Sequence, residues 1–216
     1  MKTAIVIGPT GLVGGYITQK LLADDRYEKV KVFVRKSFGI SNPKLEKHIV
    51  NFDNVEHWKD KLFGDELYSA FGTTKNKAGS KEAQYTVDYT YQYEIAKAAS
   101  QNRVLKYLLV SSVGANYKSG NFYLRMKGKL DEKVQQLSFN QVFIFRPSIL
   151  VGEIGEKRLG EFLGIKLAGA ITKIIPALKK YRPIEAEIVA EAMIKSANQT
   201  SLDRIKIFQS EEIFKI

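Results

Sequence analysis

Two serines, a tyrosine and a lysine in the middle of the chain are of the types that carry out acid–base chemistry on a carbonyl group or an alcohol. Ser111 and Ser112 end an apolar segment, and Tyr123 and Lys127 follow it, four residues apart. On a helix, that spacing places both side chains on one face. A lysine cation beside a phenol favours the phenolate, so the tyrosine can exchange a proton near neutral pH, while a serine hydroxyl polarises the carbonyl oxygen. We therefore predict Tyr123 as acid–base, Lys127 as its partner, and Ser111 or Ser112 as the polarising group.

Position, rather than spacing, selects this tyrosine–lysine pair. The same spacing occurs four times, as Tyr16–Lys20, Tyr27–Lys31, Tyr93–Lys97 and Tyr123–Lys127. Only the last pair opens a predicted helix directly after a strand that ends in serine, and parallel α/β sheets bind ligands at the carboxyl ends of their strands. Which serine faces the site stays open, because neighbouring residues of a strand point to opposite sides. For Tyr123 the alternative is a partly buried ring with a hydrated hydroxyl.

A glycine-rich loop near the start of the chain predicts a dinucleotide site. Gly8, Gly11 and Gly14 lie between an apolar strand segment and the first helical segment. In such a βαβ unit the first glycine allows a tight turn, the second lets backbone N–H groups approach a pyrophosphate, and the third lets the helix pack close to the sheet. The helix N-terminus adds a positive dipole end for the phosphates. The alternative is a turn whose glycines serve packing only.

The residues after the second and third predicted strands bear on which dinucleotide is bound. Arg35 and Lys36 stand where an NAD-selective site has an acidic residue, and arginine there accommodates a 2′-phosphate, so we predict NADP(H). The alternative is a pair of solvated cations at a strand end. Asp53 has two interpretations that the sequence leaves open. It accepts a hydrogen bond from the adenine amino group, or it is the N-cap of a helix that begins near Val55. The turn at residues 71–74 would line the far ribose.

The pattern along the chain predicts an α/β fold with a doubly wound parallel sheet, the NAD(P)-binding Rossmann fold. Short apolar segments alternate with helical ones, which indicates strands covered by helices on both faces. The predicted strands are 3–8, 30–34, 48–52, 66–71, 105–112, 142–146 and 204–209. The predicted helices are 12–24, 55–63, 81–102, 121–138, 158–174 and 185–198. We expect a single domain over 1–216, with about 148–216 forming a C-terminal extension on the substrate side.

Composition excludes several classes of protein and site. With 44% hydrophobic and 26% charged residues, the chain of 216 residues is globular rather than disordered or collagen-like. The absence of cysteine excludes disulfides and thiolate sites, and two histidines supply a zinc site poorly, so we expect no metal. The net charge of +11 is spread along the chain, which does not favour specific nucleic-acid binding. No apolar run approaches the roughly 18 residues of a membrane span, and we expect a soluble, cytoplasmic protein.

The motifs together resemble a known family, the atypical short-chain dehydrogenase/reductases of the HIV Tat-interacting-protein type. The resemblance covers most of the chain. It is carried by GPTGLVG, by VRK after the second strand, by FGTTKNKAGS, LLVSSVGAN and NFYLRMKGKLDEKV, and by FRPSILVGEIGEKRLGE. Two departures are Pro9, where many members have alanine, and a C-terminal tail that is less similar.

The resemblance implies a role for each matching residue. Tyr123 would be the proton donor and acceptor, and Lys127 would hold the nicotinamide ribose. The cofactor would be NADP(H), with Arg35 and Lys36 on its 2′-phosphate. The other residues implied in cofactor binding are Gly8, Pro9, Thr10, Gly11, Leu12, Val13, Gly14, Phe71, Gly72, Leu150 and Arg158.

The leading hypothesis is thus an NADP(H)-dependent oxidoreductase acting on a small carbonyl compound or alcohol. A second hypothesis is an NADPH-binding sensor or regulatory protein with little catalysis, because only about 70 residues follow Arg146. A third is a nucleotide-sugar epimerase-like enzyme, which the same tyrosine and lysine would serve. The chain is expected to be a monomer or a homodimer, since the predicted helices 81–102 and 121–138 could pair across a two-fold axis or face water.

Overall fold

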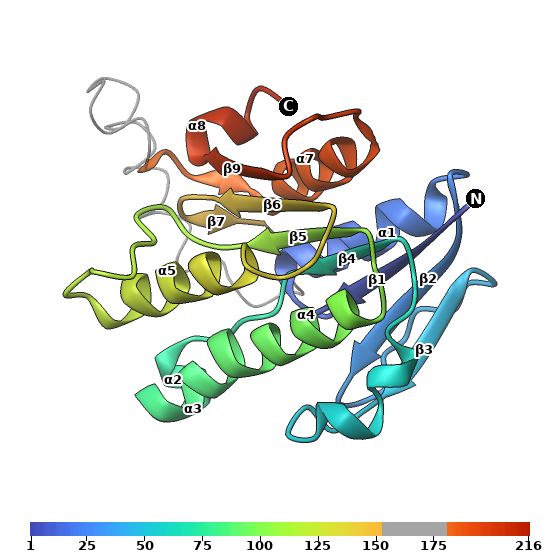
Figure 1. The fold of residues 1–216 in the computed structure, drawn as a ribbon, viewed down its shortest axis with the longest axis horizontal. Helices are drawn as coiled ribbons and strands as arrows, with labels where there is room; N and C mark the ends of the chain where they lie inside the picture. Colours follow the sequence, from blue (N-terminus) through green and yellow to red (C-terminus); the bar gives the residue numbers. More distant parts are fainter. Residues whose placement is uncertain (153–180) are drawn as a thin grey trace.

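A seven-stranded parallel sheet forms the centre of the molecule in the computed structural model, which describes residues 1–152 and 181–216 (Figure 1). The strand order is β3-β2-β1-β4-β5-β6-β9, so the winding direction reverses between β1 and β4. This confirms the predicted doubly wound α/β fold. The strands are β1 (Lys2–Ile7), β2 (Tyr27–Val34), β3 (Leu45–Ile49), β4 (Glu66–Ser69), β5 (Lys106–Val110), β6 (Gln141–Arg146) and β9 (Ile205–Gln209).

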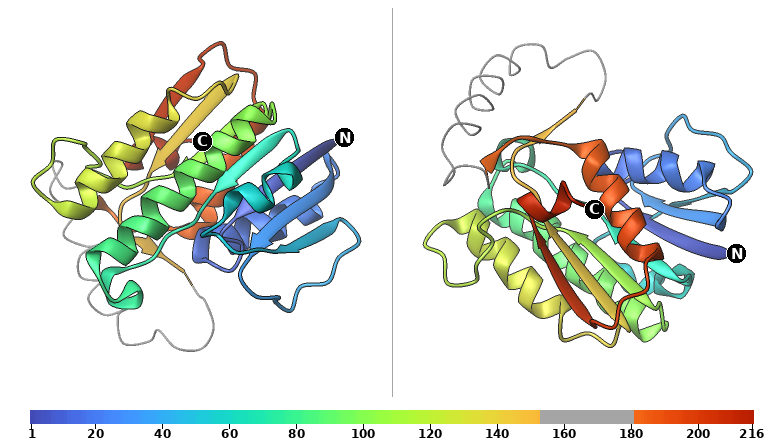
Figure 2. Two further views of the ribbon diagram at one scale, coloured as in Figure 1. Left: turned by 60° about the horizontal axis from the view of Figure 1, so that its bottom comes forward. Right: turned by 90° about the horizontal axis from the view of Figure 1, so that it is seen from above.

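Helices cover both faces of the sheet (Figures 1 and 2). The helices α1 (Leu12–Ala23) and α7 (Ala186–Asn198) lie on one face, and α4 (Gln92–Gln101) and α5 (Phe122–Val134) lie on the other. The strands are apolar on both sides, as burial from two directions requires. In β1, for example, Val6 belongs to the core under α1 and α7, whereas Ile5 and Ile7 belong to the core under α4.

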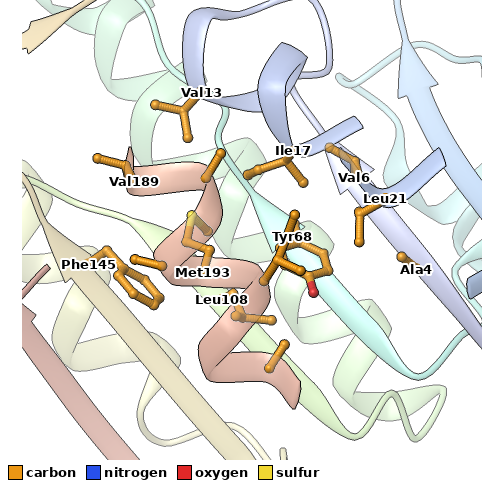
Figure 3. Close-up of a cluster of buried hydrophobic side chains, with 14 of the residues drawn as sticks. Ala4, Val6, Val13, Ile17, Leu21, Tyr68, Leu108, Phe145, Val189 and Met193 are labelled. Atoms are coloured by element: carbon orange, nitrogen blue, oxygen red, sulfur yellow. The ribbon is translucent and has the colours of Figure 1, made fainter. Parts of the chain in front are cut away.

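The helices α1 and α7, which are far apart in the sequence, form one helical layer on the same face of the sheet. Ile17 and Leu21 of α1 are fully buried and belong to the same core cluster as Val189 and Met193 of α7 (Figure 3). The strand β9 then pairs in parallel with β6 at the edge of the sheet. Within the expected extension 148–216, residues 186–209 are therefore part of the main sheet and its helical cover.

Several predicted elements differ from the observed ones. The predicted helix 55–63 is two 3₁₀ turns, η1 (Val55–His57) and η2 (Lys59–Lys61), and β3 starts and ends three residues before the predicted strand. The predicted helix 81–102 is α3 (Lys81–Tyr85), a π-helix η3 (Thr86–Tyr91) and α4 in succession. The predicted helix 158–174 lies outside the described residues. Elements not predicted are α2 (Lys75–Ala78), β7 (Leu150–Val151), β8 (Ile184–Glu185) and α8 (Ser210–Ile213).

In the two described ranges, no helix combines the length and the apolar character that a membrane crossing requires.

Candidate functional site

A groove follows the carboxyl ends of β1, β2, β4 and β5. It consists of three adjoining pockets of about 440, 440 and 430 Å³. We call the first the β2 pocket, which Arg35 and Lys36 line. The second is the central pocket, whose lining includes Gly8, Gly11 and Lys77. The third is the β5 pocket, which Ser111 lines. Thr10 and Phe71 line all three, so the pockets form one continuous groove at the point where the strand order reverses.

The glycine loop forms one wall of this groove and has the tight geometry that its sequence predicts. Gly8 has a φ of 83°, and a Cβ atom there would lie 2.6 Å from the carbonyl oxygen of Ala70. A Cβ atom on Gly14 would lie 2.0 Å from the carbonyl oxygen of Gly8, so the helix and the loop touch backbone to backbone. Gly11 is the N-cap of α1, and no side chain caps this helix. The first N–H groups of α1 are therefore open to an anionic ligand.

The predicted 2′-phosphate residues lie at one end of the groove. Arg35 and Lys36 line the β2 pocket together with Pro9, Thr10, Phe52 and Phe71. Among the described residues, neither cation makes a side-chain hydrogen bond or ion pair. The rings of Phe52 and Phe71 lie with centroids 4.9 Å apart and give the pocket an aromatic wall. An unpaired arginine beside an aromatic wall suits a phosphorylated nucleoside.

Asp53 does not cap the turn that follows it. Asn54 is the N-cap of η1, and its side chain makes no capping hydrogen bond. Asp53 instead accepts a hydrogen bond from the hydroxyl of Tyr91. Burial and this hydrogen bond raise the pKa of Tyr91 to about 12. The N-cap alternative is thus wrong, and Asp53 is not among the residues that line the β2 pocket.

The predicted acid–base residues meet at the other end of the groove. Tyr123 and Lys127 line the β5 pocket from the first turns of α5, and Ser111 lines it from the end of β5. Tyr123 is 36% exposed, whereas Lys127 is 3% exposed. The Lys127 ammonium donates to the carbonyl oxygen of Val110 over 3.1 Å. Ser112 is not part of the lining, so strand alternation directs Ser111, and not Ser112, to the groove.

A buried carboxylate, Asp88, completes this end of the groove. It is 2% exposed, and its Oδ1 lies 4.0 Å from Nζ of Lys127. Its Oδ2 accepts a hydrogen bond of 2.9 Å from the N–H of Thr73. Burial raises the pKa of Asp88, and the positive charge of Lys127 and the Thr73 hydrogen bond oppose that rise. Asp88 therefore connects the loop after β4 to the lysine of α5.

Sequence reasoning missed Asp88, although a pattern in the chain marks it. Gln84, Asp88 and Gln92 are spaced four residues apart, and all three are buried. A polar stripe on the buried face of an amphipathic helix is unusual and points to a polar site beneath it. The π-helix η3 contains Asp88, and such segments are frequent at functional sites.

A second buried carboxylate lies under the β5 pocket. Asp131 of α5 is fully buried, and its Oδ2 accepts a hydrogen bond of 3.0 Å from Nε of Arg146 and forms an ion pair of 2.9 Å with Nη2 of the same residue. Burial raises the pKa of Asp131, while the nearby Ser111 hydroxyl and Arg146 lower it. This ion pair ties the end of β6 to α5 and supports the floor of the pocket beside Ser111.

The remaining predicted residues are distributed along the groove. Gly72, Leu12, Val13 and Leu150 line the β5 pocket. Arg158 lies outside the described residues. Thr73, which belongs to the turn 71–74 that we expected along the cofactor, lines both the central and the β5 pocket, and so does Lys77, which the sequence analysis did not single out. Within residues 1–152 and 181–216, no group of three or more histidine, cysteine or acidic side chains is arranged to hold a metal ion.

Sequence comparison finds relatives of nearly the same length. The chain is 32% identical over 203 residues to "Protein fmp52, mitochondrial" of Emericella nidulans, covering 91% of this chain and 87% of the relative. It is 31% identical over 227 residues to "Protein FMP52-1, mitochondrial" of Scheffersomyces stipitis, covering 99% and 98%. No protein-family model matches the chain. The expectation of a cytoplasmic protein is contradicted, because these relatives are named mitochondrial.

Structure comparison shows the fold in proteins of much lower identity. A short-chain dehydrogenase/reductase superfamily protein of Agrobacterium tumefaciens with bound NAD aligns with a TM-score of 0.73 at 11% identity, over 97% of this chain and 78% of that one. MoeE5 in complex with UDP-glucuronic acid and NAD aligns with a TM-score of 0.71 at 11% identity, over 95% and 75%. These similarities support the Rossmann fold. The narrower resemblance to the Tat-interacting-protein type stays a prediction.

Proposed function

This chain belongs to the Fmp52 family, and we propose that it is an NADP(H)-dependent oxidoreductase of the short-chain dehydrogenase/reductase type, acting on a small carbonyl compound or the corresponding alcohol. One observation carries the proposal. A single groove joins a glycine loop at a helix N-terminus, an unpaired arginine at one end, and a tyrosine–lysine pair at the other.

The groove fits a dinucleotide in its shape and in its donors. A Cβ atom on Gly14 would clash with the carbonyl oxygen of Gly8, so glycine lets the loop pack against the start of α1, whose first N–H groups have no side-chain cap. Those donors suit the pyrophosphate. The aromatic wall of the β2 pocket suits the adenine, and the unpaired Arg35 suits a 2′-phosphate. The β5 pocket then receives the nicotinamide end, next to Tyr123.

The chain's own residues supply positioning and the proton. Bound NADP(H) supplies the hydride. Tyr123 gives its hydroxyl proton to the carbonyl oxygen during reduction and takes it back during oxidation. Lys127 stabilises the phenolate and holds the ribose, with its ammonium group kept in place by the carbonyl oxygen of Val110. Ser111 lies on the floor of the same pocket and orients the carbonyl. Since the Fmp52 relatives are named mitochondrial, we propose the same location for this protein.

Titration with NADPH and with NADH, followed by calorimetry, tests the proposal. We expect the protein to bind NADPH more tightly than NADH. Arg35→Ala should raise the Kd for NADPH by about 10–100-fold and leave the Kd for NADH nearly unchanged, because only NADPH carries the phosphate. Arg26→Ala is the matched control, since Arg26 is exposed and pairs with Asp24 at the opposite edge of the sheet.

Each contrary result removes a different part of the proposal. If the protein binds NADPH and NADH equally, the role of Arg35 is wrong and the dinucleotide site stands. If it binds neither, the oxidoreductase proposal is wrong.

A further inference from the structure

Lys77 is a cation of the groove that neither the glycine-loop motif nor the tyrosine–lysine pair includes. It lies in the short helix α2, and it lines both the central and the β5 pocket. Its ammonium group makes no hydrogen bond or ion pair with any described residue. Among the described residues that line the three pockets, Asp88 is the one carboxylate, and Asp88 lies beside Lys127. Within residues 1–152 and 181–216, the charge of Lys77 therefore has no partner in the groove.

The backbone that carries Lys77 is anchored by buried side chains. Asp88 accepts a hydrogen bond from the N–H of Thr73, and Nε2 of Gln84 donates to the carbonyl oxygen of Thr73 over 3.3 Å. The Thr74 side chain caps α2 by accepting from the N–H of Lys77, also over 3.3 Å. Both Gln84 and Asp88 are buried. The Cα of Lys77 thus has a defined place on the wall after β4, although its side chain is exposed.

Lys77 and the glycine loop line the same pocket. The central pocket is lined by Gly8, Thr10 and Gly11 from the loop after β1, and by residues 70–73 together with Lys77 from the segment that follows β4. Arg35 is at its β2 end. A diphosphate held by the N–H groups of α1 carries a second set of oxygens that those N–H groups do not reach. A lysine serves as a compact, mobile positive charge for such oxygens.

We propose that the Lys77 ammonium group binds the pyrophosphate of the dinucleotide from the segment that follows β4, in addition to the N–H groups of α1. This rests on the proposed function, because it requires a dinucleotide in the groove. Arg35 and Lys77 then have separable roles. Arg35 discriminates between the two dinucleotides through the 2′-phosphate, and Lys77 strengthens the binding of both through the diphosphate that they share.

The test compares Lys77→Met with Lys75→Met in calorimetric titrations with NADPH, NADH and 2′-AMP. Lys75 is on the same short helix and is not among the residues that line the groove, so it controls for the loss of one positive charge nearby. We expect Lys77→Met to raise the Kd values for NADPH and NADH by the same factor, about tenfold. The Kd for 2′-AMP, which lacks a diphosphate, should stay unchanged, and Lys77→Arg should restore binding.

Three results would overturn the inference. One is an unchanged Kd for both dinucleotides in Lys77→Met, and another is a loss confined to NADPH and 2′-AMP, which would place Lys77 on the 2′-phosphate. The third is an equal loss in Lys75→Met, which would indicate a general effect of charge. If the wild-type protein binds neither dinucleotide, the proposed function itself fails and this inference fails with it.

Discussion

The two ends of the parallel strands, which we call the amino edge and the carboxyl edge of the sheet, both carry charged side chains beside a pocket, yet those charges are paired differently. At the amino edge, a pocket of about 710 Å³ is lined by Lys2, Lys106 and Arg204. All three cations have partners there: Lys2 pairs with Glu66, Lys106 donates to the carbonyl oxygen of Ala197, and Arg204 donates to three backbone carbonyls. At the carboxyl edge, Arg35, Lys36 and Lys77 have no such partner among the described residues.

The amino edge is built around Glu66, which is 1% exposed. Its two oxygens accept hydrogen bonds of 2.7 Å from Lys2, from the hydroxyl of Tyr27 and from the hydroxyl of Tyr68. Burial and the nearby Glu66 carboxylate raise the pKa values of both tyrosines, so both stay protonated donors. A satisfied network of this kind stabilises the fold and leaves nothing for a ligand.

The difference shows that pocket size alone does not mark the functional site. The amino-edge pocket is larger than any of the three that form the groove. What distinguishes the groove is that three of its cations, Arg35, Lys36 and Lys77, have no partner among the described residues, and that the N-terminus of α1 beside it has no side-chain cap. Variants at the amino edge should therefore change stability, and variants at the carboxyl edge should change turnover or affinity.

The largest effect is expected at the carboxyl edge for Tyr123→Phe, which removes the hydroxyl group that we propose transfers the proton. Turnover in an NADPH-oxidation screen over small aldehydes and ketones should fall by about 10²–10⁴-fold. The Kd for NADPH and the free energy of unfolding should change little, because the ring remains. Tyr117→Phe is the control, since Tyr117 is 46% exposed and is not among the groove-lining residues. Turnover that survives in Tyr123→Phe would show that another group transfers the proton.

Glu66→Ala should give the opposite result at the amino edge. The variant removes the carboxylate that accepts from two buried tyrosine hydroxyls and from Lys2, and leaves Lys2 with its hydrogen bond to Asn198, so we expect a loss of about 1–3 kcal/mol in the free energy of unfolding. Urea denaturation measures it, with the exposed Glu28→Ala as control. The Kd for NADPH of the folded variant should stay as in the wild type. A weakened Kd with unchanged stability would remove the contrast between the two edges.

Asp88→Asn should have the smallest effect, and its sign depends on pH. Burial raises the pKa of Asp88 above its ordinary value of 3.8, so the folded state binds more protons than the unfolded state just above that pH. Stability attributable to Asp88 therefore falls as the pH rises through this window. Asparagine does not titrate, so the stability of the variant relative to the wild type should increase as the pH rises above this ordinary value. A difference in urea-derived stability that stays constant with pH would contradict this.

The sequence predicts the sheet well because its strands are short apolar runs buried on both faces. It places β1 and β6 within about a residue of their observed ends. It fails where structure depends on contacts distant in the chain or on short polar caps. The pairing of β7 with β8 joins residues 150–151 to 184–185, and α2 has four residues held by the Thr74 cap. Neither leaves a periodic pattern.

The candidate site shows the same division. The glycine loop and the helix after β5 have local signatures, and the structure brings Gly11, Ser111, Tyr123 and Lys127 to one pocket. The contacts of Asp88 and Lys77 are set by tertiary structure. Asp88 reaches Lys127 across 39 positions of sequence, through a π-helix that no propensity pattern indicates. Lys77 acquires its place only because Asp88 and Gln84 hold the loop before it.

The packing of α7 on α1 has a consequence for the order in which the protein can be made. Ile17 and Leu21 of α1 share one core with sheet residues and with Val189 and Met193 of α7, so more than 160 residues of sequence separate the two helices that meet there (Figure 3). Closing so long a loop is slow and costs entropy. Until α7 has been synthesised, the side of α1 that contacts α7 stays apolar and uncovered in the nascent chain. A chaperone that binds apolar segments would therefore bind α1, residues 12–23.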